Sequence, residues 1–129
     1  MPFVTRAREF LNNPNISSPR LNEMLETVSF LLQQTTPINT DRIVQHLTSR
    51  GYSLSPTQWQ QEVLDPLRDS GIFIGSSYRG IFIPRNEVEA QEACVFYVRR
   101  IKAERRHLNI FADLIRGVGW NPGDLEIDE

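Results

Sequence analysis

The chain has 129 residues, 40% of them hydrophobic and 23% charged, which is typical of one globular domain with a modest core. Its formal net charge of −2 argues against a protein that binds nucleic acid through overall positive charge alone. The single cysteine, Cys94, excludes an intrachain disulfide or a thiolate metal cluster, and no apolar run approaches the roughly 20 residues of a membrane span. We therefore expect a cytoplasmic protein without a membrane partner.

The first 19 residues are interpreted as an N-terminal arm. Within it, residues 5–11 could form a short helix with Phe10 and Leu11 facing inward, and polar residues and a proline follow as a loop. The arm's arginines either reach a phosphate or are solvated, and the second alternative is favoured.

The strongest helical pattern runs from Ser18 to Gln34. Ser18 is the expected N-cap, and Pro19 suits the first helical position. The apolar residues recur at i, i+3, i+4 and i+7, and they are Leu21, Met24, Leu25, Val28, Leu31 and Leu32. This pattern predicts the first helix of the core, and residues 36–38 are expected to form a short strand after it.

A second core helix is predicted from Thr40, as its N-cap, to a stop at Gly51, because Ile43 and Leu47 recur at helical spacing. Leu54, in the turn that follows, is expected to point inward.

The next helix opens at Ser55-Pro56, where Ser55 and Gln58 match a capping box. Its apolar side is formed by Trp59, Val63 and Leu67. Pro66 lies inside this pattern and predicts a kink or an early end near residues 64–65, since proline removes a backbone donor and crowds the preceding turn.

Two β-rich runs, Ile72–Ile74 and Ile81–Ile83, bracket the glycine and polar residues 75–80. They predict a β-hairpin with a loop of several residues.

This order of elements resembles a winged helix-turn-helix, in particular the small winged-helix proteins common in bacteriophages and mobile elements. The similarity is strongest in the run LRDSGIFIGSSYRGIFIP, which is like the end of a recognition helix followed by a wing. The matching residues are Leu67, Arg68, Ser70, Gly71, Ile74, Ser76, Ser77, Arg79, Gly80, Ile83 and Pro84. Phe82 stands where tyrosine is usual, and the similarity covers residues 37–106. The resemblance implies a mainly α fold with a small hairpin wing over residues 20–85, followed by a long C-terminal helix.

The resemblance also implies where DNA would be contacted. A recognition helix reads base edges from its N-terminal residues, and hydroxyl, amide and arginine side chains suit base and phosphate contacts. The candidate DNA-binding residues of this helix and the wing are Ser55, Thr57, Gln58, Gln61, Arg68, Ser76, Ser77, Tyr78 and Arg79. Tyr78 alternatively lies over the sheet, and Glu62 and Asp65 would repel phosphate.

A long helix is predicted over residues 86–116, with Asn86 as its cap. It carries an apolar stripe with steps of three and four residues, interrupted by Glu104. The apolar stripe consists of Ala90, Cys94, Tyr97, Ile101, Leu108, Phe111 and Ile115. We expect part of it to cover the core, with Cys94 buried, and the remainder to form a homodimer. The predicted dimerisation residues are Tyr97, Ile101, Leu108, Phe111 and Ile115.

The charge of the chain is distributed unevenly. A basic segment within residues 99–106 has a net charge of +4, because five bases stand against Glu104. The bases are Arg99, Arg100, Lys102, Arg105 and Arg106, and they are further DNA-binding candidates. The alternative is a solvated helix face. Residues 117–129 form an acidic tail that ends in four acids without a base, so residues 1–116 carry +2.

The sequence therefore predicts sequence-specific binding of double-stranded DNA by a dimeric transcriptional regulator, or by a phage or plasmid replication protein. The alternative is a non-catalytic adaptor that uses the same scaffold to bind a protein partner. No phosphate loop, metal-ligand spacing or nucleophile–base set is present, so neither an enzyme nor a cofactor is expected.

Overall fold

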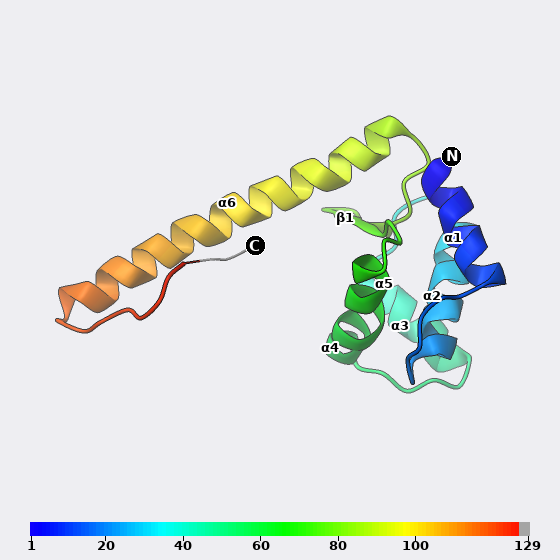
Figure 1. Ribbon diagram of the computed structural model, residues 1–129, viewed down its shortest axis with the longest axis horizontal. Helices are drawn as coiled ribbons and strands as arrows, with labels where there is room; N and C mark the ends of the chain where they lie inside the picture. Colours follow the sequence, from blue (N-terminus) through cyan, green and yellow to red (C-terminus); the bar gives the residue numbers. More distant parts are fainter. Residues whose placement is uncertain (127–129) are drawn as a thin grey trace. The chain divides into compact units, whose positions relative to one another are not determined.

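The computed structural model describes residues 1–126 and divides the chain into two units, Met1–Phe96 and Tyr97–Glu129 (Figure 1). Its elements in chain order are α1 (Pro2–Asn12), α2 (Leu21–Gln33), α3 (Thr40–Ser49), α4 (Pro56–Trp59), the π-helical turn η1 (Gln60–Leu64), α5 (Asp65–Asp69), β1 (Gly75–Ser77), β2 (Gly80–Phe82) and α6 (Glu87–Gly117). The chain is thus mainly helical, with one two-stranded hairpin and a long C-terminal helix, as expected. The last residues of the acidic tail, 127–129, lie outside the described part.

Helix α1 belongs to the core of the first unit, although the sequence placed it in an arm. Its residues Val4, Ala7 and Phe10 follow one another at helical spacing and are all buried. The inward position of Phe10 is confirmed, whereas Leu11 is only half-buried. The helix therefore begins earlier than expected, and its buried side packs against α2.

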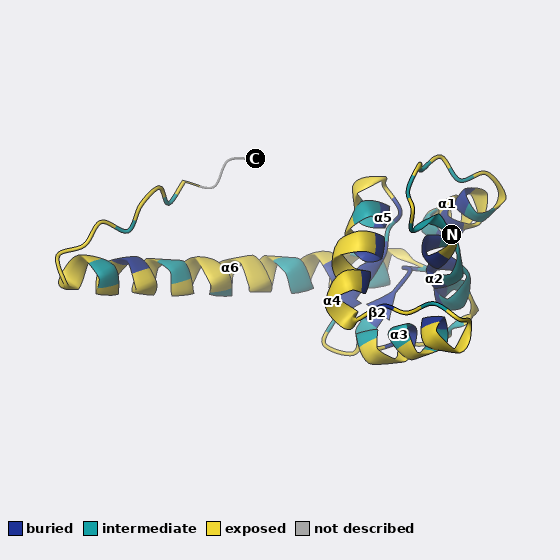
Figure 2. Ribbon diagram, turned by 90° about the horizontal axis from the view of Figure 1, so that it is seen from below, coloured by how far each residue is buried: buried dark blue, intermediate teal, exposed yellow. Residues whose placement is uncertain are grey.

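The core is built from the apolar sides of α2, α3 and the α4–η1–α5 helix, as their periodicity predicted. Figure 2 shows these helices with their buried sides turned inward and their exposed sides outward. Fully or almost fully buried are Met24, Val28, Leu31, Ile43, Leu47, Trp59, Val63 and Leu67. Leu54 is also buried, which confirms that the turn before α4 closes over the core.

Trp59 is the largest fully buried side chain, and its indole N–H has a partner. The Nε1–H of Trp59 donates a hydrogen bond to Oγ1 of Thr27 in α2, with an N–O distance of 3.1 Å. Thr27 is itself fully buried. Because an unpaired polar group in this position would lose its hydration without compensation, the bond fixes the position of α4 against α2.

The predicted N-caps of α3 and α2 were wrong by one and two residues. Helix α3 is capped by Asn39, whose Oδ1 accepts from the backbone N–H of Arg42 at 2.9 Å, and not by Thr40. Helix α2 begins after Arg20, because the Oγ of Ser18 accepts from the N–H of Arg20 in a local turn. In both cases a neighbouring side chain accepts a hydrogen bond from a backbone N–H near the start of the helix, where the N–H groups have no partner within the helix. The capping box of Ser55 and Gln58 is confirmed.

Pro66 neither ends nor breaks its helix. Residues 60–64 form a π-helical turn, in which the N–H of Asp65 bonds to the carbonyl of Gln60, and the helix then continues as α5 to Asp69. A π-turn takes up one additional residue and changes the angular position of the residues after it. Val63, Leu64 and Leu67 are consequently all buried on the same side as Trp59.

The hairpin is shorter and tighter than predicted. Only Gly75–Ser77 and Gly80–Phe82 form strands, and Tyr78 and Arg79 alone make the turn. Ile72 and Ile74 are buried in the core and not in a strand, so the prediction for the first run was wrong. The short strand expected at residues 36–38 is reduced to one bridge between Ile38 and Ile81, with N–O distances of 2.7 and 2.9 Å.

Helix α6 begins and ends with side-chain and backbone caps. The Oδ1 of Asn86 accepts from the N–H of Glu89 at 2.9 Å, which confirms the predicted cap. At the other end, the N–H groups of Trp120 and Gly119 bond to the carbonyls of Ile115 and Arg116 at 3.1 and 3.0 Å. This is the Schellman arrangement, and it ends the helix within one residue of the expected position.

Replacing Thr27 by valine is expected to lower the free energy of unfolding by about 1–3 kcal/mol, because the buried Trp59 N–H would lose its acceptor without a change of volume. Urea denaturation measures this. Thr27→Ser is the control, since it keeps the hydroxyl and removes only a methyl group, worth about 0.8 kcal/mol. No loss of stability in Thr27→Val would show that the hydrogen bond contributes nothing.

Replacing Gly80 by alanine is expected to destabilise the fold far more than the same change at Gly71. Both glycines have positive φ, 132° and 91°, but a Cβ at Gly80 would lie 2.6 Å from the carbonyl oxygen of Ile38, whereas the space around Gly71 is open. Gly71→Ala is expected to cost about 1–2 kcal/mol for the backbone conformation alone. Thermal unfolding compares the two, and similar melting temperatures would contradict the close approach at Ile38.

Candidate nucleic-acid interface

The α4–η1–α5 helix presents a polar outer side, and four of the predicted DNA-binding residues lie on it. Ser55, Thr57, Gln58 and Gln61 are all exposed. Two of them also cap the helix, because Gln58 Oε1 accepts from the Ser55 N–H at 2.9 Å and Ser55 Oγ accepts from the Gln58 N–H at 3.1 Å. The amide NH₂ of Gln58 and the side chains of Thr57 and Gln61 remain on the surface for recognition.

Glu62 on this helix is paired with Arg20, which it shares with Glu23, so the three side chains together keep one negative charge. Arg20 Nε donates to Glu62 Oε1 at 3.0 Å, and its Nη1 donates to Glu23 Oε2 at 2.9 Å. The hydrogen bond to Glu23, and after it the hydrogen bond to Glu62, raises the pKa of Arg20 above its usual value. The repulsion of phosphate expected from Glu62 is therefore reduced, whereas Asp65 is exposed on the same helix.

The hairpin turn exposes Tyr78 and Arg79, although the guanidinium of Arg79 also faces Glu92 of α6. Tyr78 is 90% exposed, so it does not lie over the sheet. The backbone N–H of Arg79 donates to Ser77 Oγ at 3.1 Å, a local contact that shapes the turn. Ser77 is half-buried. The tip of the hairpin thus exposes an aromatic ring and a guanidinium, both of which suit contact with a nucleic-acid backbone.

Arg68 and Ser76, which were also predicted to bind DNA, are hydrogen-bonded to each other within the fold. Arg68 Nε donates to the carbonyl of Ile74 at 2.7 Å, and its Nη2 donates to Ser76 Oγ at 2.8 Å. Ser76 is only 8% exposed. The pair joins the end of α5 to β1, so these side chains hold the hairpin against the helix and are not presented at its tip.

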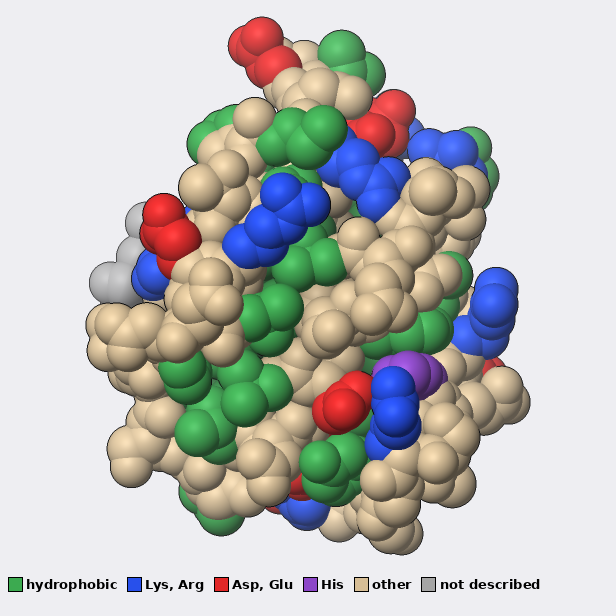
Figure 3. Space-filling model, turned by 90° about the vertical axis from the view of Figure 1, so that its right-hand side faces the viewer, with side chains coloured by type: hydrophobic (Ala, Val, Ile, Leu, Met, Phe, Trp, Pro, Cys, Tyr) green, Lys and Arg blue, Asp and Glu red, His purple; other side chains and the backbone are tan. Residues whose placement is uncertain are grey.

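The helix and the hairpin lie on one side of the first unit. Figures 1 and 2 both place α4 and the hairpin on the side away from α1. Figure 3 views the molecule from the α1 side, where Lys and Arg side chains are interspersed with Asp and Glu and do not form a patch of one sign.

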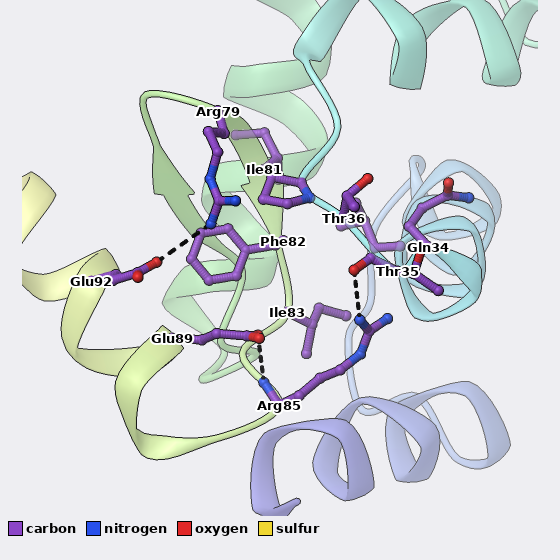
Figure 4. A pocket seen from close by; sticks show the side chains of 12 residues that line it. Gln34, Thr35, Thr36, Arg79, Ile81, Phe82, Ile83, Arg85, Glu89 and Glu92 are labelled. Carbon is purple, nitrogen blue, oxygen red and sulfur yellow. Dashed lines mark hydrogen bonds and ion pairs between the residues drawn. The ribbon is translucent and has the colours of Figure 1, made fainter.

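A cleft that the sequence did not predict lies behind the hairpin (Figure 4). It has a volume of about 150 Å³ and is lined by residues of the hairpin, the segment after α2 and the start of α6. Arg79 Nη2 lies 3.8 Å from Glu92 Oε2 across it, and Arg85 Nη1 donates to the carbonyl of Thr35 at 3.2 Å. No local pattern signals the cleft, because its sides come from segments about 50 residues apart in the chain.

The basic segment is exposed in the second unit. Arg99, Arg100, Lys102, Arg105 and Arg106 lie on the surface of α6, as the sequence predicted. By helical geometry Arg99, Lys102, Arg105 and Arg106 fall within about one third of the circumference. Exposed bases in this arrangement suit contact with phosphate, and the solvated face remains the alternative.

The apolar stripe of α6 is more exposed than expected. Cys94 is exposed, so the prediction that it is buried was wrong. The reason is that α6 approaches the hairpin through Ala93, which is buried close to Gly75, and this turns the neighbouring Cys94 away from the core. Ile101 and Phe111 are 53% and 58% exposed. The predicted dimerisation residues Tyr97, Leu108 and Ile115 are half-buried.

The described residues were also searched for metal sites and membrane-spanning helices. Residues 1–126 contain no group of three His, Cys, Asp or Glu side chains that could hold a metal ion. No helix within those residues is sufficiently long and apolar to cross a membrane. His46 stacks on Phe30, with ring centroids 4.1 Å apart, and its Nε2 lies 3.3 Å from Oε2 of Glu26. Its contacts therefore join α3 to α2.

Replacing Arg68 by alanine is expected to lower the free energy of unfolding by about 1.5–3 kcal/mol, because two hydrogen bonds from a charged group would be lost. Ser76→Ala, which removes one acceptor, is expected to cost about 0.5–1.5 kcal/mol. Both are measured by urea denaturation. A change within about 0.5 kcal/mol for Arg68→Ala, as for an ordinary surface residue, would show that the side chain does not hold the hairpin.

Comparison of the chain with protein-family models, with curated proteins and with solved structures finds no match.

Proposed function

We propose that the protein binds double-stranded DNA as a homodimer, with the first unit acting as a winged helix-turn-helix. In this proposal the α4–η1–α5 helix enters the major groove, and the hairpin is the wing. The observation that carries the proposal is that the α4–η1–α5 helix and the hairpin both lie on the side of the unit away from α1. The helix exposes Thr57, Gln58 and Gln61, and the hairpin exposes Tyr78 and Arg79. Amide side chains at the start of such a helix suit adenine, and the hairpin tip suits the backbone.

Two further features support DNA as the partner. Arg20, which is shared with Glu23, pairs with Glu62 beside the proposed groove-facing side and partly offsets its repulsion of phosphate. The basic segment of α6 adds exposed positive charge, which suits contact with a phosphate backbone. The proposed biological role is transcriptional regulation, with replication of a phage or plasmid as the close variant.

The alternative proposal is a protein-interaction adaptor. It is favoured by the exposed acids Asp65 and Asp69 on the α4–η1–α5 helix and by the contact of Arg79 with Glu92. In the adaptor, the same exposed side binds a protein, and phosphate has no part in recognition.

Arg79→Glu combined with Arg99→Glu is expected to abolish DNA binding while leaving the dimer intact. Titration of a mixed-sequence duplex at two salt concentrations measures this. For wild type the affinity should fall steeply with salt, and each lost phosphate contact should reduce the slope of log K against log salt by about 1.

The matched control is Arg6→Glu combined with Arg8→Glu. These exposed arginines lie on α1, and the substitution changes the net charge by the same amount. An equal loss of affinity in the two double variants would mean that net charge alone matters, and the interface proposed here would be wrong. No binding by wild type at low salt, together with a clean dimer mass, would favour the adaptor.

A further inference from the structure

The apolar stripe of α6 follows a heptad repeat along the helix. Its residues occupy the two core positions of successive heptads, with Glu104 at the position between Ile101 and Leu108. Cys94 is exposed, and Ile101 and Phe111 are more than half exposed, although such a stripe is normally covered. The features that decide what covers it are the order of side-chain sizes and the place of the one charge.

We propose that a second copy of this chain covers the stripe and that the two α6 helices pair antiparallel about a midpoint between Lys102 and Ala103. The inference deepens the homodimer of the proposed function and rests on that dimer, but it does not depend on DNA binding. The midpoint lies at the centre of Glu87–Gly117, so the whole helix, about 46 Å long, takes part.

Side-chain size favours the antiparallel arrangement. The small residues Ala90 and Cys94 lie in the first half of the stripe, and Leu108, Phe111 and Ile115 lie in the second half. Antiparallel pairing about this midpoint sets Ala90 opposite Ile115 and Cys94 opposite Phe111. In these two layers a small residue meets a large one, as close packing requires, whereas Tyr97 meets Leu108 in the next layer, which is larger.

A parallel pair in register would bring like residues together. The layers of Ala90 and Cys94 would be underfilled, and two Phe111 rings would crowd one layer. The uneven distribution of sizes along the stripe is therefore unfavourable for a parallel dimer.

The position of Glu104 leads to the same conclusion. In a parallel pair the two Glu104 carboxylates would share one layer of the core, where like charges repel strongly. In the antiparallel pair each Glu104 lies opposite Ile101 of the second copy, with Arg100 of that copy bordering the layer. The carboxylate thereby gains a basic neighbour across the interface.

Cysteine cross-linking distinguishes the two arrangements because the chain has one native cysteine. Antiparallel pairing places the two Cys94 residues about 25 Å apart along the axis, far beyond the ~7 Å limit between Cα atoms of a disulfide. Parallel pairing places them in one layer. The variant Phe111→Cys creates an antiparallel partner for Cys94, and within a single helix the two positions are again about 25 Å apart.

Three proteins are oxidised with a mild catalyst and analysed on non-reducing gels: wild type, Phe111→Cys, and Phe111→Cys with Cys94→Ala. Sedimentation of the reduced full chains is measured beforehand. Antiparallel pairing predicts a dimer in solution and a covalent dimer from Phe111→Cys only. Parallel pairing predicts covalent dimers from all three.

If Phe111→Cys weakens the dimer itself, Ala90→Cys with Ile115→Cys in a Cys94→Ala background tests a second layer and should also cross-link. A covalent dimer from wild type, or no cross-link from either designed pair in a dimeric protein, would overturn the arrangement. A monomeric wild-type chain would overturn the inference altogether. DNA binding, which is measured separately, would remain an independent question.

Discussion

The buried hydrogen bond between Trp59 and Thr27 is the constraint on which the first unit depends. It joins the helix that carries the candidate DNA-facing residues to α2, the central helix of the core. An indole of this size, fully buried, fixes both the distance and the rotation of that helix, because its N–H has to meet one particular hydroxyl. The exposed positions of Thr57, Gln58 and Gln61 follow from this rotation.

The π-turn η1 extends the same constraint past Pro66. An uninterrupted α-helix would rotate the residues after Trp59 by 100° each, and proline would lack its donor in the second turn. The additional residue in η1 lets Leu67 return to the core and lets Arg68 reach the hairpin. With this turn the helix accommodates Pro66 and still keeps its apolar residues buried on one side.

Local rules predicted much of the fold from sequence. The spacing of Met24, Val28 and Leu31 predicted α2, and the Ser55 capping box and the Asn86 cap predicted two helix starts. These features depend on residues at most a few turns apart. The strand assigned to Ile72–Ile74 was wrong because an apolar run does not reveal whether it will pair as a strand or fill the core.

The candidate site was predictable only where exposure follows from helical phase or turn chemistry. Thr57, Gln61, Tyr78 and Arg79 are exposed as expected, since phase and turn composition fix them. Contacts between distant segments were not predictable. Arg20 meets Glu62 across 42 residues, and no pattern in either helix indicates it. Cys94 was misplaced for the same reason, because the side of α6 that meets the hairpin is decided by tertiary packing.

The bonds from Arg68 to Ile74 and Ser76 have a mechanical consequence. They connect the C-terminal end of the α4–η1–α5 helix to the hairpin through side-chain hydrogen bonds in addition to the chain itself. A ligand that displaces Tyr78 or Arg79 is therefore expected to affect the position of the helix that carries Thr57 and Gln61, and not the hairpin alone.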